Sequence, residues 1–172
     1  MFKRVCVAVL LSTTPLWSTV AWSSDYFTGA HGDIGVIAIN GNGFKTHGME
    51  LNIGYDFNAF LCMNLSVAYA KDDLAVDYLG TGANLEVGLP YRLHDELTIK
   101  PYVMFGGVYS DTKLTEEVCT NDECSLIREN KTDTQGVFGL GGRFVFINHI
   151  NVNFSYQFSQ LDLISLRIGL KF

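Results

Sequence analysis

Two cysteines are the first residues in this sequence whose type and spacing could do chemistry. Cys119 and Cys124 are separated by Thr-Asn-Asp-Glu in a polar stretch of the chain. Oxidising surroundings favour the pairing of such cysteines in an exported protein. We therefore predict a disulfide between Cys119 and Cys124 that restricts the shape of the local segment. Two solvent-exposed thiols are the alternative.

A serine and a histidine could supply a hydrolytic centre. An enzyme built into a membrane barrel, such as a lipid A-modifying hydrolase, needs a nucleophile beside a histidine on the lipid-facing surface. Ser155 and His149 are the nearest such pair on one strand, but alternation places Ser155 on a polar inner face and His149 at a turn. The sequence contains no phosphate-binding glycine loop and no metal-ligand cluster. We predict no enzymatic activity, no cofactor and no metal.

Charged residues at alternating positions form the third set. Glu50, Glu86, Lys100, Arg143 and Arg167 occupy the polar sides of segments that otherwise alternate polar with apolar residues. Complementary charges among small residues would fill a narrow interior by pairing, so we predict a network of ion pairs there. The same charges lining a small-solute channel are the alternative, which the width of a small barrel opposes.

The elements that must position these residues are strands. A period of two, typical of strands, is clearest over residues 150–159 and 164–172. It predicts eight strands, at 33–39, 48–57, 64–70, 84–91, 97–110, 138–146, 150–159 and 164–172. A membrane helix over 144–161 is excluded because it would expose amides such as Asn151 and Asn153 to hydrocarbon. Residues 111–134 are polar and without period, and we expect them to form the longest loop.

The apolar faces decide between a soluble barrel and a membrane barrel. Leu, Ile and Val lie at mid-strand, and aromatic residues lie near the strand ends, as the two bilayer interfaces require. These aromatic residues are Tyr55, Phe57, Tyr69, Tyr91, Phe146, Phe158 and Phe172. We therefore predict an all-β fold, an eight-stranded antiparallel up-and-down transmembrane β-barrel. Short connections after the second, fourth and sixth strands would face the periplasm, and 111–134 would face outside.

The N-terminus predicts the compartment. Lys3 and Arg4 precede an apolar run that ends in Ala21-Trp22-Ser23, a pattern typical of a secretory signal peptide. We expect residues 1–23 to be removed and 24–172 to form the barrel. Removing 23 of 172 residues leaves 149, and losing two cations takes the formal charge from −6 to about −8. This acidic balance argues against nucleic-acid binding.

Three segments resemble a known family. Gly54-Tyr55-Asp56-Phe57-Asn58, the stretch 84–113 with Leu89-Pro90-Tyr91 and His94-Asp95-Glu96-Leu97, and Tyr156-Gln157-Phe158 followed by 165–172 resemble the OmpA-type transmembrane domain. OmpX-like small barrels are the next most similar group. The chain departs from many of these relatives in that nothing follows Phe172 where a peptidoglycan-binding domain would begin. Leu170 also stands where an aromatic residue is common.

The resemblance implies a location and a set of partners. It implies a barrel in the outer membrane, in contact with membrane lipids and lipopolysaccharide, with loops that in various members contact host surfaces, phage or other cells. Phe172 matches the C-terminal signal that the barrel-assembly machinery reads. We therefore predict a non-enzymatic integral outer-membrane protein with a structural or adhesive role, and with the segment 111–134 exposed to a host or cell-surface ligand.

Overall fold

The computed structural model describes residues 27–41, 44–72, 76–120, 123–147 and 149–172. The side chains of Phe44, 116–120 and 123–128 lie outside this description, as does the predicted signal peptide. The described residues form the strands β1 (Gly29–Gly41), β2 (Phe44–Asp56), β3 (Leu61–Lys71), β4 (Val76–Gly88), β5 (Tyr91–His94), β6 (Leu97–Thr120), β7 (Glu123–Phe146), β8 (Ile150–Phe158) and β9 (Asp162–Lys171).

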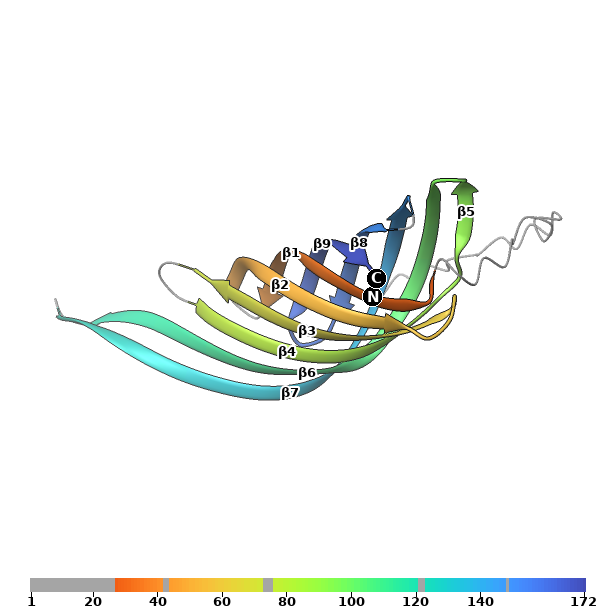
Figure 1. Cartoon of the computed structure of the whole chain (residues 1–172). Helices are drawn as coiled ribbons and strands as arrows, with labels where there is room; N and C mark the ends of the chain where they lie inside the picture. Colours follow the sequence, from red (N-terminus) through yellow and green to blue (C-terminus); the bar gives the residue numbers. More distant parts are fainter. Residues whose placement is uncertain (1–26, 42–43, 73–75, 121–122, 148) are drawn as a thin grey trace, which may run out of the picture.

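These strands close into an antiparallel barrel (Figure 1). Neighbouring strands pair in chain order, β9 pairs with β1, and β4 pairs with β6. The short β5 also pairs with β6 and continues the line of β4. The break between β4 and β5 falls at Leu89-Pro90, where proline has no N–H to donate to the ladder. β4 and β5 thus count as one strand of the barrel, and the predicted eight-stranded antiparallel barrel is confirmed.

The barrel has two ends, which we name by what they carry. The terminal end holds the start of β1 and the end of β9, where the Phe172 N–H donates to the Ala30 oxygen at 2.8 Å. The turns β2–β3, β5–β6 and β7–β8 lie at this end. The hairpin end holds the other connections. There β6 and β7 run on together past the ends of the neighbouring strands (Figure 1).

Side chains alternate between the two sides of the barrel wall. In β8, Asn151, Asn153, Ser155 and Gln157 are buried, whereas Ile150, Phe154 and Phe158 are exposed. All seven aromatic residues predicted for the barrel rims are also exposed. The polar face therefore lies inside and the apolar face outside, the reverse of a soluble ligand-carrying barrel. No helix among the described residues is long and apolar enough to cross a membrane.

The prediction that residues 111–134 form a loop without regular structure is wrong. β6 and β7 continue through this segment and pair residue by residue from Asp111 opposite Thr132 to Thr120 opposite Glu123. A period of two appears in a sequence only where one face of a strand is apolar. Residues 129–134 are polar at every position and largely exposed, so the ladder forms there without leaving that pattern.

The predicted strand 84–91 also starts too late, because it leaves the first half of β4 in a loop. β4 begins at Val76 instead. Val76 and Tyr78 point inward and are 3% and 2% exposed, whereas Leu79 points outward and is 48% exposed. Apolar residues therefore occupy both faces of this stretch, which conceals the alternation.

Candidate functional site

The barrel interior at the terminal end holds a concentration of charged side chains. Glu50, Glu86, Lys100, Arg143 and Arg167, the residues expected to face inward, are each at most 2% exposed. They come from five different strands, β2, β4, β6, β7 and β9. Burial of this many charges is costly unless they are paired.

Arg143 connects three strands across the interior. Its Nη1 donates to both carboxylate oxygens of Asp56, at 3.0 and 3.1 Å, and its Nη2 donates to Glu86 Oε2 at 2.7 Å. Lys100 Nζ lies 3.6 Å from Asp56 Oδ1. Charge-assisted bonds of this kind are among the strongest in proteins. These contacts tie β7 to β2 and β4, and β6 to β2, through the barrel interior.

A second ion pair lies closer to the hairpin end. Arg167 Nη1 is 3.6 Å from Glu50 Oε1. Arg167 stands opposite Gly35 of β1 in the ladder. A Cβ atom at position 35 would lie 2.6 Å from Arg167 Cγ. Glycine at this position therefore leaves the space that the arginine side chain fills.

Buried amides extend the ion pairs into a network. Asn52 Nδ2 donates to Asp33 Oδ2 and to Asn64 Oδ1, both at 3.1 Å, and Asn64 Nδ2 donates to Asn84 Oδ1 at 3.3 Å. His31 Nε2 lies 3.1 Å from the same Asn64 oxygen. Sequence reasoning did not single out these residues. The signal was available for Asn52, which shares its face with Glu50, but not for His31, which precedes the poorly alternating part of β1.

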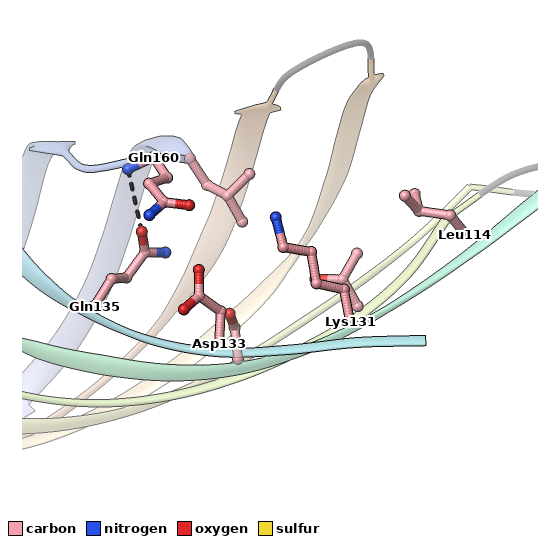
Figure 2. Close-up of a pocket in the computed structure, with 8 residues that line it drawn as sticks. Leu114, Lys131, Asp133, Gln135 and Gln160 are labelled. Carbon is pink, nitrogen blue, oxygen red and sulfur yellow. Dashed lines mark hydrogen bonds between the residues drawn. The ribbon is translucent and has the colours of Figure 1, made fainter. Parts of the chain in front are cut away.

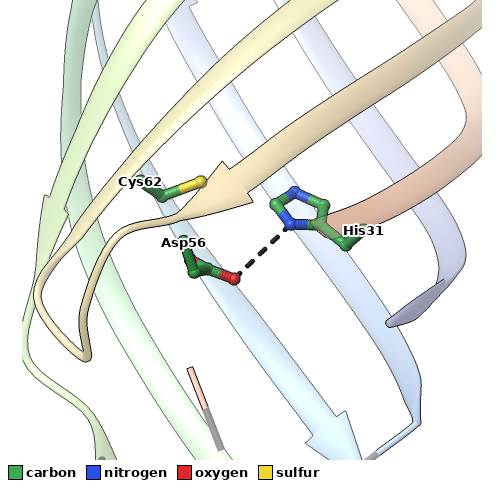
Figure 3. Close-up of side chains that lie close together, drawn as sticks. All are labelled: His31, Asp56 and Cys62. Atoms are coloured by element: carbon green, nitrogen blue, oxygen red, sulfur yellow. Dashed lines mark ion pairs between the residues drawn. The ribbon is translucent and has the colours of Figure 1, made fainter. Parts of the chain in front are cut away.

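His31, Asp56 and Cys62 bring nitrogen, oxygen and sulfur donors within 4.8 Å of one another (Figure 3). This donor set matches the ligands of Zn²⁺. However, Arg143 already donates to both Asp56 oxygens and lies 3.7 Å from Cys62 Sγ, and Lys100 lies beside the same carboxylate. A divalent cation would face two protein cations and compete with both of them for the Asp56 carboxylate. These residues do not fit a metal ion and belong to the ion-pair network.

An aromatic residue covers this network at the terminal end. The Phe27 side chain is 1% exposed. Its ring centroid lies 5.2 Å from Lys100 Nζ and 5.6 Å from Lys171 Nζ. Both distances are within the range of cation–π attraction. Phe27, two residues before β1, therefore packs across the opening of the barrel, a contact that the sequence did not predict.

An apolar cluster occupies much of the interior at the hairpin end. Ile37, Ile39, Ala68, Ala70, Val76, Tyr78 and Leu163 form a buried cluster there, and Leu114 and Leu161 pack against it. We call the seven buried residues, without Leu114 and Leu161, the apolar plug. It was not expected from the sequence, which predicted a polar interior throughout.

Ser155 and His149, which were considered as a hydrolytic pair and not favoured, are separated in the structure. His149 is exposed in the β7–β8 turn, whereas Ser155 is fully buried and its Oγ lies 2.7 Å from Ser165 Oγ. Six residues of strand separate the two side chains, about 20 Å. The geometry gives no support to a nucleophile activated by this histidine.

The remaining predicted residues lie at opposite ends of the molecule. Phe172 is 80% exposed and its backbone remains bonded to β1. The backbones of Cys119 and Cys124 stand directly opposite each other in the β6–β7 ladder. Directly opposed residues in antiparallel strands have Cα atoms about 4.5–5.5 Å apart, a separation that a disulfide spans. The disulfide stays a prediction, because both side chains lie outside the described set.

One family model matches almost the whole chain. The outer membrane protein beta-barrel domain matches residues 5–170. No match was found among curated proteins.

Solved structures share the fold. The N-terminal β-barrel domain of Pseudomonas aeruginosa OprF aligns with a TM-score of 0.57 and 15% identity, over 83% of this chain and 97% of that one. Yersinia pestis Ail, the attachment invasion locus protein, aligns at 0.50 and 17%, over 84% and 99%. Neisserial surface protein A aligns at 0.51 and 12%, over 83% and 96%. The similarity to small outer-membrane barrels that the sequence predicted is confirmed.

Proposed function

The chain belongs to the outer membrane protein beta-barrel family, and from this premise we propose that it is a non-enzymatic barrel whose β6–β7 hairpin contacts the cell exterior. The observation that carries the proposal is the hairpin itself. β4 pairs with β6 only as far as Val76 opposite Leu114, yet β6 and β7 stay paired to Thr120. Six more paired residues extend the hairpin about 20 Å beyond β4.

The orientation in the membrane follows from the connections. Outer-membrane barrels have short periplasmic turns and longer outer loops. The terminal end carries only short turns, so it would face the periplasm, and the hairpin end would face outside. Export by the predicted signal peptide 1–23 would deliver the chain to this location. Outer-membrane lipids and lipopolysaccharide would surround the exposed apolar wall.

The charge of the hairpin limits its partners. Residues 111–134 contain seven acidic side chains and three basic ones, a formal charge of −4. Like charges oppose close contact, and complementary surfaces speed encounter. Ail was crystallised with the heparin analogue sucrose octasulfate, a polyanion. For the chain described here we instead propose a positively charged host or cell surface as the hairpin's partner.

The interior favours a structural role over a channel. Arg143, Arg167, Lys100 and Met104 are among the largest fully buried side chains. An eight-stranded barrel is just wide enough for side chains to fill. The apolar plug adds a second filled layer at the hairpin end. We therefore propose that Glu50, Glu86, Lys100, Arg143 and Arg167 hold the barrel together.

A register-preserving truncation tests the proposed function. Removing 116–127 and joining Thr115 to Arg128 through Asn-Gly keeps a directly opposed pair at the new tip. We expect normal membrane insertion, seen as a heat-modifiable gel band, and loss of binding to cationic surfaces. A full-length control with Glu116→Gln, Glu117→Gln and Glu123→Gln should lose binding to the same extent. Failure of the truncated chain to fold, or undiminished binding by both variants, would contradict the proposal.

Phe172 is proposed as the signal for the barrel-assembly machinery. Its side chain is exposed at the end of the last strand, where another protein can reach it. Phe172→Ala should lower the folded fraction in cells while leaving refolding in detergent unchanged. Equal loss in both settings would mean that Phe172 stabilises the barrel itself.

A further inference from the structure

A small cavity lies at the hairpin end, between the inner face of the β6–β7 hairpin and the β8–β9 turn. Its volume is about 90 Å³. Leu114 and Leu161 line it and also pack against the apolar plug, so the cavity rests on the plug and is closed toward the barrel interior. A site here would be reached from the hairpin end.

Fixed polar groups form the walls. Ser110 and Thr112 of β6 are 2% and 6% exposed and line the cavity with their hydroxyl-bearing side chains. The Gln160 N–H donates to Gln135 Oε1 at 3.1 Å (Figure 2). This bond joins the turn to the hairpin and uses the oxygen of the Gln135 amide, which leaves its NH₂ as a donor for a ligand.

Two opposite charges stand side by side at the cavity. Lys131 and Asp133 are two residues apart on β7, and their side chains lie on the same side of the strand (Figure 2). Among the described residues, neither makes an ion pair within 4.0 Å. Deeper inside the barrel, by contrast, Glu50, Asp56, Glu86, Lys100, Arg143 and Arg167 are paired with one another. The ammonium and the carboxylate are therefore available to a ligand.

The arrangement selects among ligand classes. A simple anion bound to Lys131 would be repelled by Asp133, and a simple cation bound to Asp133 would be repelled by Lys131. A neutral sugar would cover both charges without supplying a counter-charge. A ligand that carries both charges satisfies both residues. The cavity volume equals the share of about three water molecules, which suits an ammonium, a carboxylate and one short aliphatic group.

We propose that this cavity binds a small zwitterion of the α-amino acid class, with its carboxylate on Lys131 and its ammonium on Asp133. The hydroxyls of Ser110 and Thr112 and the amide of Gln135 would complete the polar contacts. A short aliphatic side chain would meet Leu114 and Leu161. A ligand this small, at an exposed pair of charges, binds with a Kd in about the millimolar range.

Binding can be measured on the refolded full chain in detergent, so the result does not depend on membrane orientation or on hairpin adhesion. L-alanine is titrated by ligand-observed NMR beside acetate, methylammonium and glycerol. We expect L-alanine to saturate at millimolar concentration and the other three to bind at least about fivefold more weakly. Absence of saturation by about 0.1 M, or acetate binding as tightly as alanine, would overturn the proposal.

Matched variants locate the site. Lys131→Gln and Asp133→Asn should each weaken L-alanine binding about fivefold, whereas Lys113→Gln, on the outer face of the same hairpin, should leave it unchanged. The exchange Lys131→Asp with Asp133→Lys should restore most of the affinity, because a zwitterion can reverse its direction. An equal loss in Lys113→Gln, or no recovery in the exchange variant while its folded gel band is intact, would count against the site. The hairpin truncated at 116–127 keeps every lining residue, so it should still bind alanine even if adhesion is lost.

Discussion

At the terminal end of the barrel, Arg143 donates to Asp56 and Glu86 from across the interior, and buried amides surround them. At the hairpin end, Ile37, Ile39 and their neighbours fill the same cross-section mainly with apolar side chains, beside the hydroxyls of Ser110 and Thr112. Both halves are packed and both are enclosed by the same strands. They differ in their contacts: ion pairs and hydrogen bonds need a particular geometry, whereas apolar contacts do not.

The difference teaches what each half contributes. Apolar contacts stabilise in proportion to buried area and accept small shifts of position. A guanidinium held by two carboxylates accepts only one arrangement of the strands that carry them, because a shift would leave a buried charge unpaired. We infer that the terminal half fixes the alignment of strands and that the apolar plug closes the other half without doing so.

Removing Arg143 is the strongest test of the difference between the two halves of the barrel interior. Arg143→Met should lower the free energy of unfolding by about 3–5 kcal/mol, because Glu86 stays buried without its ion-pair partner and Asp56 loses two charge-assisted hydrogen bonds. The folded gel band across a urea series measures the change. The double variant with Glu86→Gln should lose less than Arg143→Met alone. A loss below about 1 kcal/mol in Arg143→Met would mean that water replaces the guanidinium and the network is dispensable.

Truncation in the apolar plug should cost less. Ile39 is 2% exposed, and Ile39→Ala should lower the free energy of unfolding by about 2 kcal/mol through lost burial and a residual cavity. Ile34→Ala is the matched control, since Ile34 lies on the same strand and is 46% exposed on the outer wall. If both variants lose the same free energy of unfolding, a buried side chain of the plug stabilises the barrel no more than a side chain on the membrane-facing surface.

One substitution can be made in both halves. Tyr102 donates its hydroxyl to Asn153 Oδ1 at 2.6 Å within the polar half, and Tyr78 belongs to the apolar plug. Tyr102→Phe should cost about 1–2 kcal/mol, because the amide oxygen is left buried and unpaired. Tyr78→Phe should change stability by less than about 0.5 kcal/mol. Equal effects in the urea series would show that the halves do not differ in directional bonding.

The same contrast explains what could be predicted from the sequence. Strands such as β8 and β9 were clear because one face meets lipid and the other meets polar atoms, which leaves a period of two. The alternation is lost at Val76 and Tyr78, where apolar residues face inward, and over residues 129–134, which are polar at every position. Pattern reasoning detects a strand only when its two environments differ.

The sequence predicted which charged residues face the barrel interior, but not which of them pair with one another. Glu86 and Arg143 could be placed inside by alternation alone. That Arg143 meets Asp56, 87 positions away in sequence, depends on the tilt and stagger of a closed barrel, which no local pattern carries. The cavity beside Lys131 and Asp133 was unpredictable for a related reason, since the segment was expected to be a loop without an inner face.

The predicted disulfide tests whether the hairpin tip is energetically separate from both halves. In the folded protein we expect Cys119 and Cys124 to resist alkylation until a reductant is added, and buried Cys62 to react only after unfolding. The double variant Cys119→Ser, Cys124→Ser should change the free energy of unfolding of the barrel by less than about 0.5 kcal/mol, because the bond closes a short ring beyond the packed interior. Mass spectrometry after alkylation and the urea series measure the two effects. A destabilisation as large as that of Ile39→Ala would mean that the tip is coupled to the apolar plug through β6 and β7.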